Sequence, residues 1–353
     1  MGLSRAHVSL GLLVLAAWLA LPVASEGLVP EPPSPDADAQ QVPLEVFTSA
    51  RVLERAPLRY PGSARRSARE GWVALNCVVA ADGTLSEVSV HDSTGQPEFE
   101  TAAMEWMRAN RLEPARSGTR AVDSTFRYKV TFVMANEERG ARLSFVRTFR
   151  RLMAALQVKD RAVADAELAA LDVQNLYEDA YHHLARYHYA TIWGDERTRV
   201  LALRAAIANE KHGRYLPRAD FMSAARALFV ANVRASDFGS ALAAYELLDA
   251  EAQADPMVAK AAAEVRALAT DGRAFTTEGV VSERGFWATR LLKAHFTIAP
   301  RQGEVTDFRL YCERKFVFLK LQPEMQYTRS TDHGNCDIEI VGTPGASFAL
   351  TQF

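Results

Sequence analysis

Two cysteines near the end of the chain are the residues whose type and spacing most directly suggest chemistry. A disulfide between Cys312 and Cys336 would close a loop of about 25 residues and stabilise the fold by about 3.5 kcal/mol. A metal site with His333 as a third ligand is the alternative, but no clear fourth ligand accompanies it. We predict the disulfide, because the N-terminal segment described below indicates export to an oxidising compartment. The third cysteine, Cys77, lies in an apolar strand pattern and is expected to be a buried free thiol.

The remaining nucleophilic and metal-binding residues do not form a known catalytic motif. The chain has no His-Glu-x-x-His, Gly-x-Ser-x-Gly, Gly-Lys-Ser or Cys-x-x-Cys sequence. Histidines and tyrosines gather between Tyr181 and Tyr189, but no two of these histidines have the i, i+4 spacing that lets helical histidines share a metal. We interpret them as packing residues that could also line a peptide groove. The sequence therefore predicts no enzyme, no metal site and no cofactor.

Length and composition indicate a globular chain of several domains. With 353 residues, the chain is longer than a domain with a single hydrophobic core usually is. Its 48% hydrophobic and 24% charged residues are typical of folded protein. The formal net charge is -2, with Lys and Arg spread along the chain. This charge distribution argues against nucleic acid as a partner and against a polybasic membrane-binding patch.

The N-terminal segment has the layout of a secretory signal peptide. Arg5 precedes an apolar run from Val8 to Leu21, and small residues lead up to Ser25, the expected cleavage site. An uncleaved anchor helix is the alternative, since the apolar stretch is only just shorter than the ~20 residues that span a bilayer. Pro22 and the Val-Ala-Ser that follows favour cleavage, so we expect membrane attachment only if this segment is retained.

Shifts in composition and hydrophobic periodicity divide the rest of the chain. The predicted fold class is α+β multidomain, with a small three-stranded antiparallel sheet and two helices, then an α-helical hairpin array, then a small all-β domain. The predicted boundaries are a signal peptide at 1–25, a Pro-rich linker at 26–50, the sheet-and-helix domain at 51–135, the helical region at 136–272 and the β-rich domain at 273–353.

The expected sheet begins with a hairpin. Asp82-Gly83 separates two strand patterns, Trp72 to Val79 and Leu85 to His91, and we expect both turn residues to adopt positive φ. A helix is predicted from Pro97 onward. Alternation of apolar and polar residues from Thr125 to Met134 then predicts a third, half-buried strand.

This region resembles the TonB C-terminal domain family over residues of about 58–134. The resemblance implies a three-stranded antiparallel sheet packed by two helices, whose last strand can accept an extended peptide from an outer-membrane receptor. The residues that follow the family's order and approximate spacing are Tyr60-Pro61, Ala64, Ala68, Gly71, Val73, Val78-Val79, Asp82-Gly83, Val88, Val90, Ser93-Thr94-Gly95, Ala102-Ala103, Arg111-Leu112, Pro114-Ala115, Gly118 and Phe132.

The strand that matches the family's peptide-binding element is the candidate functional site. Its polar residues, which suit an exposed sheet edge, alternate with apolar ones. The alternative is that the helical region or the C-terminal β domain covers this edge, which would make the sheet structural. The candidate edge-strand residues are Phe126, Arg127, Tyr128, Lys129, Val130, Thr131 and Phe132.

The two regions that follow differ in periodicity. Breaks between Asn136 and Gly272 predict six or seven helices in hairpin pairs. Within them, Ala225 to Pro256 resembles a tetratricopeptide unit, although the breaks do not recur at one fixed period. From Phe275 the period changes to two, which predicts the β-rich domain fastened by the disulfide.

These features predict an exported periplasmic TonB-like protein that acts as a peptide- or protein-binding adaptor in the bacterial cell envelope. Its expected partners are envelope or outer-membrane proteins or peptides. The alternative is a membrane-anchored TonB-type energy transducer for outer-membrane transport, held in the inner membrane and facing the periplasm. Family transducers cross the periplasm on a long Pro-rich segment, whereas Glu26 to Leu58 spans at most ~115 Å when fully extended, which favours the adaptor.

Overall fold

The computed structural model describes residues 47–134, 140–208, 215–322 and 325–353, all of which belong to one compact unit. The predicted signal peptide and the predicted linker up to residue 46 lie outside the described residues. Within the described ranges, none of the helices combines the length and the apolar character that crossing a bilayer requires.

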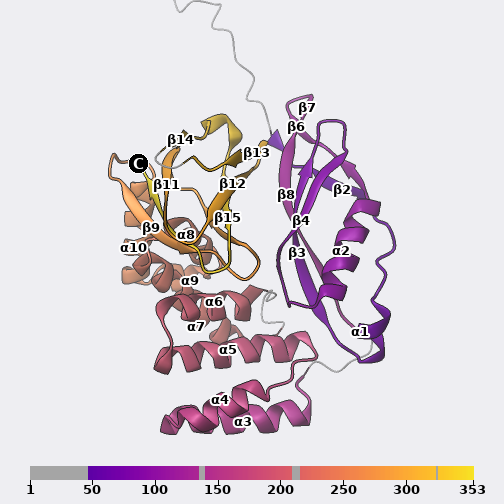
Figure 1. The fold of residues 1–353 in the computed structure, drawn as a ribbon, viewed down its shortest axis with the longest axis vertical. Coiled ribbons are helices and arrows are strands. Elements are labelled where there is room, and N and C mark those ends of the chain that lie inside the picture. Colours follow the sequence, from indigo (N-terminus) through magenta and orange to yellow (C-terminus); the bar gives the residue numbers. More distant parts are fainter. Residues whose placement is uncertain (1–46, 135–139, 209–214, 323–324) are drawn as a thin grey trace, which may run out of the picture. The chain divides into compact units, whose positions relative to one another are not determined.

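The N-terminal part of the described chain is an α+β domain built around three antiparallel strands. Strand β3 is central, with β4 and β8 at the two edges, and α2 packs against β3 and β4 (Figure 1). The predicted three-stranded antiparallel sheet with two helices is confirmed. Its elements are β1 (Phe47–Thr48), β2 (Arg51–Glu54), α1 (Gly62–Arg66), β3 (Gly71–Val79), β4 (Leu85–Ser93), α2 (Pro97–Ala109), β5 (Arg111–Glu113), β6 (Ala115–Ser117), β7 (Arg120–Val122) and β8 (Ser124–Phe132).

The turn of the β3–β4 hairpin differs from the prediction. Gly83 has a φ of 86°, but Asp82 does not share its positive φ. The Gly83 N–H donates to the Ala80 carbonyl, and the Ala80 N–H donates to Thr84. The Asp82 carboxylate accepts the Thr84 N–H at 2.8 Å. The expectation of two positive φ angles was therefore wrong, because the connection is longer than a two-residue turn and needs only one left-handed residue, supplied by glycine.

Strand β3 is buried on both of its faces, whereas the sequence pattern of β8 in the same sheet predicted a half-buried strand. All nine residues of β3 are buried. On one face, Val73 and Leu75 join a core with Phe99 of α2. On the other face, Trp72 and Ala74 belong to the core of the helical region. Residues outside the α+β domain therefore cover the second face of the sheet.

Two small sheets flank the main one and have no counterpart in the predictions. One has the order β1-β6-β7 and the other pairs β2 with β5. Each strand is two to four residues long. Alternation over so few residues carries almost no signal, because a strand pattern needs about four to eight residues to be recognised.

A run of helices follows, arranged largely as antiparallel pairs. Contacts join α3 with α4, α5 with α6, and α7 with α8, and Figure 1 shows the pairs as successive layers. The described residues contain eight helices here, compared with the six or seven predicted, and α9 is a single turn. The helices are α3 (Leu143–Val158), α4 (Arg161–Ala169), α5 (Leu176–Trp193), α6 (Glu196–Ala208), α7 (Arg218–Arg234), α8 (Phe238–Tyr245), α9 (Ala250–Gln253) and α10 (Pro256–Leu268).

Side-chain caps explain where several of these helices begin. Asp160, Asn175, Asp237 and Asp249 each accept a backbone N–H from the first turn of the helix that follows, and Asp255 accepts two. Short polar side chains at this position satisfy amides that lack a helical partner. The sequence pattern predicts breaks near Asp160, Asp237 and Asp255, but not the helix starts at Asn175 and Asp249.

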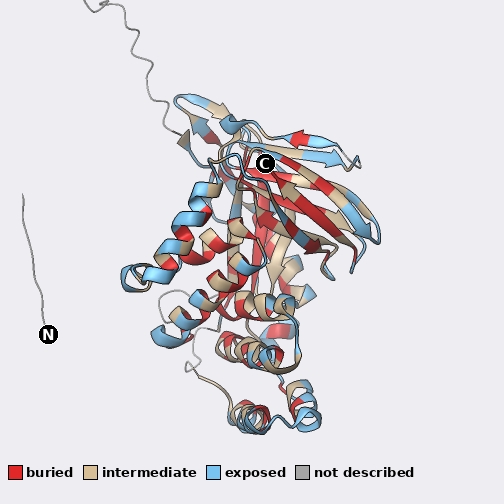
Figure 2. Ribbon diagram, turned by 90° about the vertical axis from the view of Figure 1, so that its left-hand side faces the viewer, coloured by how far each residue is buried: buried red, intermediate tan, exposed pale blue. Residues whose placement is uncertain are grey.

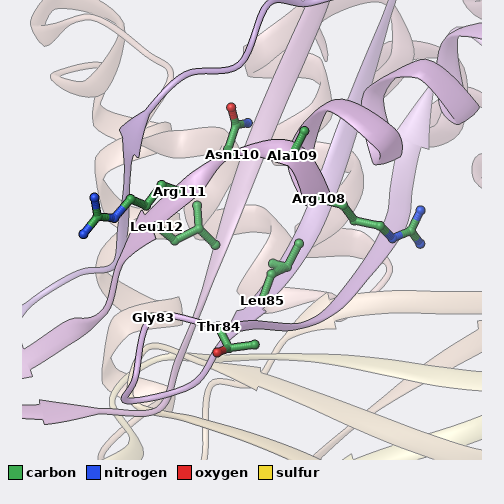
Figure 3. Close-up of a pocket in the computed structure, with 8 residues that line it drawn as sticks. All are labelled: Gly83, Thr84, Leu85, Arg108, Ala109, Asn110, Arg111 and Leu112. Carbon is green, nitrogen blue, oxygen red and sulfur yellow. The ribbon is translucent and has the colours of Figure 1, made fainter.

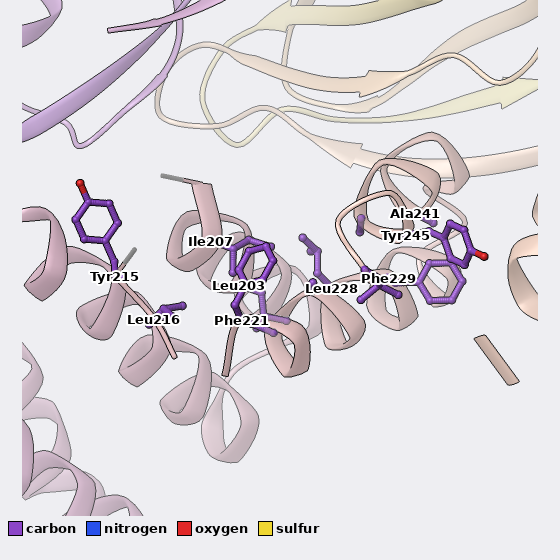
Figure 4. Packing of buried hydrophobic residues seen from close by; sticks show 14 of the residues in the cluster. Leu203, Ile207, Tyr215, Leu216, Phe221, Leu228, Phe229, Ala241 and Tyr245 are labelled. Atoms are coloured by element: carbon purple, nitrogen blue, oxygen red, sulfur yellow. The ribbon is translucent and has the colours of Figure 1, made fainter. Parts of the chain in front are cut away.

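The helical region has its own hydrophobic core. Figure 4 shows aromatic and aliphatic side chains of α6, α7 and α8 packing between the helices, among them Leu203, Phe221 and Phe229. Ala241 and Tyr245, predicted in the second helix of a tetratricopeptide-like unit, are buried in α8, which packs against α7. Buried residues lie on the sides of helices that face their neighbours, and exposed residues lie on the outer sides (Figure 2).

The C-terminal part is all-β, as predicted. Two four-stranded antiparallel sheets, with orders β10-β15-β12-β13 and β14-β11-β16-β9, share one core that includes Phe296, Phe308 and Phe348. The predicted Cys312–Cys336 disulfide is present and joins β12 to β15. The strands are β9 (Phe275–Val280), β10 (Phe286–Arg290), β11 (His295–Gln302), β12 (Val305–Cys312), β13 (Lys315–Lys320), β14 (Gln326–Thr328), β15 (Cys336–Gly342) and β16 (Ser347–Gln352), with a short 3-10 helix, η1 (Thr331–His333).

Candidate functional site

Strand β8 is an edge strand, and the register of the sheet determines which of its backbone groups face outward. The backbone N–H and C=O of Trp72 in β3 both bond to Thr94, so they point toward the β4 side. Backbone groups alternate along a strand, so those of Val73 and Leu75 point toward β8. Their partners in register are Val130 and Tyr128. The backbone groups of Thr125, Arg127, Lys129 and Thr131 in β8 consequently face the outer edge.

The apolar candidate residues of β8 belong to the core of the α+β domain. Val130 and Phe132 are buried, and Phe126 and Tyr128 are partly buried against them. The ring of Phe132 stacks on Phe99 at 4.7 Å between centroids. These four side chains hold the strand in place and are not available to a partner.

The polar side chains of β8 point to the opposite face of the sheet, where they contact the covering regions. Arg127 donates to Asn76 Oδ1 at 3.1 Å and to Asp337 Oδ2 at 3.1 Å. Lys129 donates to the carbonyl of Ala208 in α6, and its Nζ lies 4.8 Å from the centroid of the Trp72 ring. These residues therefore attach β8 to the helical region and to the β-rich domain.

Thr125, which the sequence analysis did not include in the site, connects β8 with the disulfide-bonded strand. Its hydroxyl donates to the carbonyl of Cys312 at 2.7 Å. Strands β12 and β13 both contact β8. The signal that could have identified Thr125 is its place in the same alternation as Arg127, one position before the candidate site residues.

Beside these side-chain contacts, two residues of β8 present backbone groups at the outer edge of the sheet without a hydrogen bond to a described residue. Within the described residues, neither Arg127 nor Thr131 has a backbone hydrogen bond on the outer side of the sheet. Val133, just beyond the strand, is 38% exposed. The polar side chains of β8 are thus engaged, while the outward-facing backbone groups of Arg127 and Thr131 form no hydrogen bond to a described residue.

A polar network joins the α+β domain to the β-rich domain beside β8. Glu339 of β15 is buried, and its Oε1 accepts the Asn76 side-chain amide at 2.6 Å. The same oxygen lies 3.0 Å from His91 Nδ1. Ser89 Oγ lies 3.3 Å from the hydroxyl of Tyr311. Burial raises the pKa of Tyr311 to about 12, so this hydroxyl stays protonated.

A hollow of about 450 Å³ lies between the β3–β4 turn and the end of α2. It is lined by Gly83 to Leu85 and by Arg108 to Leu112. Figure 3 shows the guanidinium groups of Arg108 and Arg111 extending in opposite directions, so they do not converge on one anion. The lining holds no acid, thiol or imidazole.

The histidine and tyrosine cluster lies on α5. Tyr181, together with Tyr177 and Phe149, lines a shallow hollow of about 280 Å³ against α3, whereas the neighbouring histidines do not. His183 Nε2 is 3.4 Å from Asp179 Oδ1. Burial, reinforced by His183, lowers the pKa of His182 to about 4. In the described part of the chain, no three His, Cys, Asp or Glu side chains gather as metal ligands.

Comparisons with known proteins concern the α+β domain. Residues 56–134 match the model of the Gram-negative bacterial TonB protein C-terminal family, which is not a family of enzymes. The solution NMR structure of the Pseudomonas aeruginosa TonB CTD is similar at 23% identity and a TM-score of 0.23, covering 26% of this chain and 92% of that one. No curated protein matches the chain. Residues 56–134, which contain β8, thus resemble the C-terminal domain of the TonB proteins of Gram-negative bacteria.

Proposed function

We propose that this chain is an exported periplasmic protein of the bacterial cell envelope that acts as an adaptor, binding extended segments of envelope or outer-membrane proteins at the outer edge of β8. The match of residues 56–134 to the TonB C-terminal family supports the envelope role. The signal-peptide layout of residues 1–25 supports export. The helical and β-rich regions act as the further recognition or stabilising units of the adaptor.

The observation that carries the binding mode is the outward-facing backbone of Arg127 and Thr131. An extended peptide that pairs with β8 would add a fourth strand to the sheet through main-chain hydrogen bonds, which need no particular side chains. Each such bond contributes about 1 kcal/mol net, so a short segment binds weakly and exchanges readily. Because α2 covers one face of the sheet and the helical and β-rich regions cover the other, the edge is the surface through which this sheet can be extended.

Export is tested at the N-terminus of the protein recovered from expressing cells. We expect the mature chain to begin at Glu26 and to fractionate with periplasmic proteins, and N-terminal sequencing with cell fractionation measures both. Retention of Met1 in the inner-membrane fraction would overturn the periplasmic adaptor and support the anchored energy transducer instead.

Strand addition at β8 is tested by a proline at an outward-facing position. Thr131→Pro removes an N–H that points away from β3, so it blocks a partner strand while the hydrogen bonds to β3 remain. Thr131→Ala keeps the N–H and is the matched control. A photo-crosslinking amino acid in place of Val133 is introduced in each background, and adducts with envelope proteins are detected in cells.

We expect the envelope-protein adducts in the Thr131→Ala background and their loss in the Thr131→Pro background. Thermal unfolding of both purified variants verifies that each one folds. Adducts that persist unchanged with Thr131→Pro would show that binding does not use the edge of β8.

A further inference from the structure

We propose that the outer edge of β13 (Lys315–Lys320) is a second docking surface, which binds an extended segment of another protein with apolar residues at its centre and acidic residues at both ends. This surface lies in the β-rich domain, outside the region that matches the TonB C-terminal family. The proposal does not depend on binding at β8.

Strand β13 is the last strand of its sheet and pairs only with β12 on its inner side. The N–H of Leu321, just beyond β13, donates to the carbonyl of Thr306, so the backbone groups of Leu321 point inward. By alternation, those of Val317 and Leu319 also point toward β12. The backbone groups of Phe316, Phe318 and Lys320 therefore face outward, and no described residue bonds to them on that side.

The side chains of β13 are unusually apolar and exposed for an edge strand. Phe318 is 51% exposed and Leu319 is 43% exposed, and they lie on opposite faces of the strand. Natural edge strands are commonly blunted by charge, proline or a bulge, because an exposed apolar edge is a template for another strand. Here the charges stand only at the two ends, which leaves a four-residue apolar edge between them.

Positive charge borders this apolar edge on both sides. Lys315 and Lys320 are exposed, and neither forms an ion pair with a described residue. Asp307 is the cross-strand neighbour of Lys320 but bonds to the Thr306 hydroxyl instead. The guanidinium of Arg314 lies 4.9 Å from the centroid of the Phe47 ring and adds to the positive end beside Lys315.

This charge arrangement decides which occupant the edge accepts. A second copy of β13 could pair antiparallel about Phe318, which would place Lys320 of one copy opposite Phe316 of the other and give neither lysine an acidic neighbour. Like charges directly opposite destabilise a strand pair, whereas opposite charges stabilise it. The complementary partner is therefore a different segment, extended over about six residues, with Asp or Glu facing each lysine.

The test is a selection from a random heptapeptide library displayed on phage, with the whole purified protein as the target. We expect the enriched peptides to carry acidic residues toward both ends and apolar residues between them. Their affinity is then measured by fluorescence anisotropy with synthetic copies. Phe318→Pro, which removes an outward N–H, should weaken binding by about tenfold more than Phe318→Ala, which keeps it.

A charge-reversed variant distinguishes a specific change in peptide preference from a loss of binding caused by local unfolding. The double variant Lys315→Glu and Lys320→Glu should select peptides with Lys or Arg at the ends, and Lys260→Glu, an exposed substitution on α10, should select the same acidic peptides as the unaltered protein. Thr131→Pro should leave the affinity of the selected peptides unchanged, which separates this surface from β8.

Three results would overturn the proposal. The first is a selection that yields no enriched peptide, or peptides that bind Phe318→Pro as well as Phe318→Ala. The second is a charge-reversed variant that still selects acidic ends. The third is a dimer in sedimentation experiments that Phe318→Pro dissociates, because the edge would then be occupied by a second copy of the chain.

Discussion

At the scale of single residues, burial sets the chemistry of the thiol of Cys77 and the imidazole of His182. Cys77 is a buried free thiol, as its place in an apolar strand pattern predicted, and burial raises its pKa to about 12. A thiol with this pKa stays protonated and unreactive at physiological pH. Cys77 therefore packs as a small apolar residue in the centre of β3.

His182 gives the fold a measurable sensitivity to acid. Its pKa is about 4 in the folded protein and 6.5 in an unfolded chain, so between these pH values only the unfolded chain binds the proton. The free energy of unfolding therefore decreases as the pH falls through this window. We expect His182 to account for a loss of about 2 kcal/mol between pH 7 and pH 5.

Urea unfolding of the protein and of His182→Gln at the two pH values measures this contribution. The variant should lose about 2 kcal/mol less stability on acidification than the unaltered protein. An equal loss of stability in the protein and in His182→Gln would contradict the assignment.

At the scale of the elements, a buried carboxylate connects the starts of two helices. Glu178 in the first turn of α5 is fully buried and accepts hydrogen bonds from the backbone N–H groups of Arg142 and Gln174. It also accepts the guanidinium of Arg142, the residue immediately before α3. The bond to Glu178 raises the pKa of Arg142. This contact holds the first two helix pairs together at one end.

Removal of the Arg142 side chain should be strongly destabilising. Arg142→Ala leaves the Glu178 carboxylate buried without its cation, which costs about 3 kcal/mol or more. Arg151→Ala, which breaks the pair with Glu167, is the control and should cost far less, because ion pairs at the surface contribute little to stability. Urea unfolding at pH 7 measures both variants, and equal losses would contradict the role given to Glu178.

At the scale of the whole molecule, the α+β sheet depends on contacts that are far away in sequence. Asn76 of β3 bonds to Glu339 of β15, and Glu70, just before β3, accepts the backbone N–H groups of Met134 and Leu176. These contacts join the sheet to the β-rich domain and to the start of α5. The domain that resembles TonB is thus one part of a larger compact unit, with its second face closed.

A double-mutant cycle on Asn76 and Glu339 measures the strength of this connection. The combined Asn76→Ala and Glu339→Ala substitutions should show a coupling energy of about 2 kcal/mol, since the bond joins an amide to a buried carboxylate. Asn76→Ala combined with Asp271→Ala, at a half-buried and separate site, should be additive within about 0.5 kcal/mol. A coupling energy near zero would mean that the interface is held together by other contacts.

The elements with long, regular patterns could be predicted from the sequence, and the relations between them could not. The hairpin strands, the start of α2 at Pro97 and the capped helices follow from alternation, proline placement and short polar caps. The double burial of β3 does not, because Trp72, Ala74 and Asn76 find their partners more than 100 residues later. For the same reason, the sequence indicated β8 as an edge strand but not that its side chains contact the covering regions.

Strand β16 is late in the chain but central in its sheet, so the sheet cannot form before β16 has been synthesised. This strand lies between β11 and β9, and the side chain of Gln352 accepts the backbone N–H groups of Leu292 and Lys293. During synthesis, β9 and β11 therefore cannot complete their sheet until residues 347–352 have been made and can pair with both. Asn76 of β3 likewise lacks its hydrogen-bond acceptor until Glu339 has been made, 263 residues later. A nascent chain of this protein thus carries an unfinished sheet until residues 347–352 have been made.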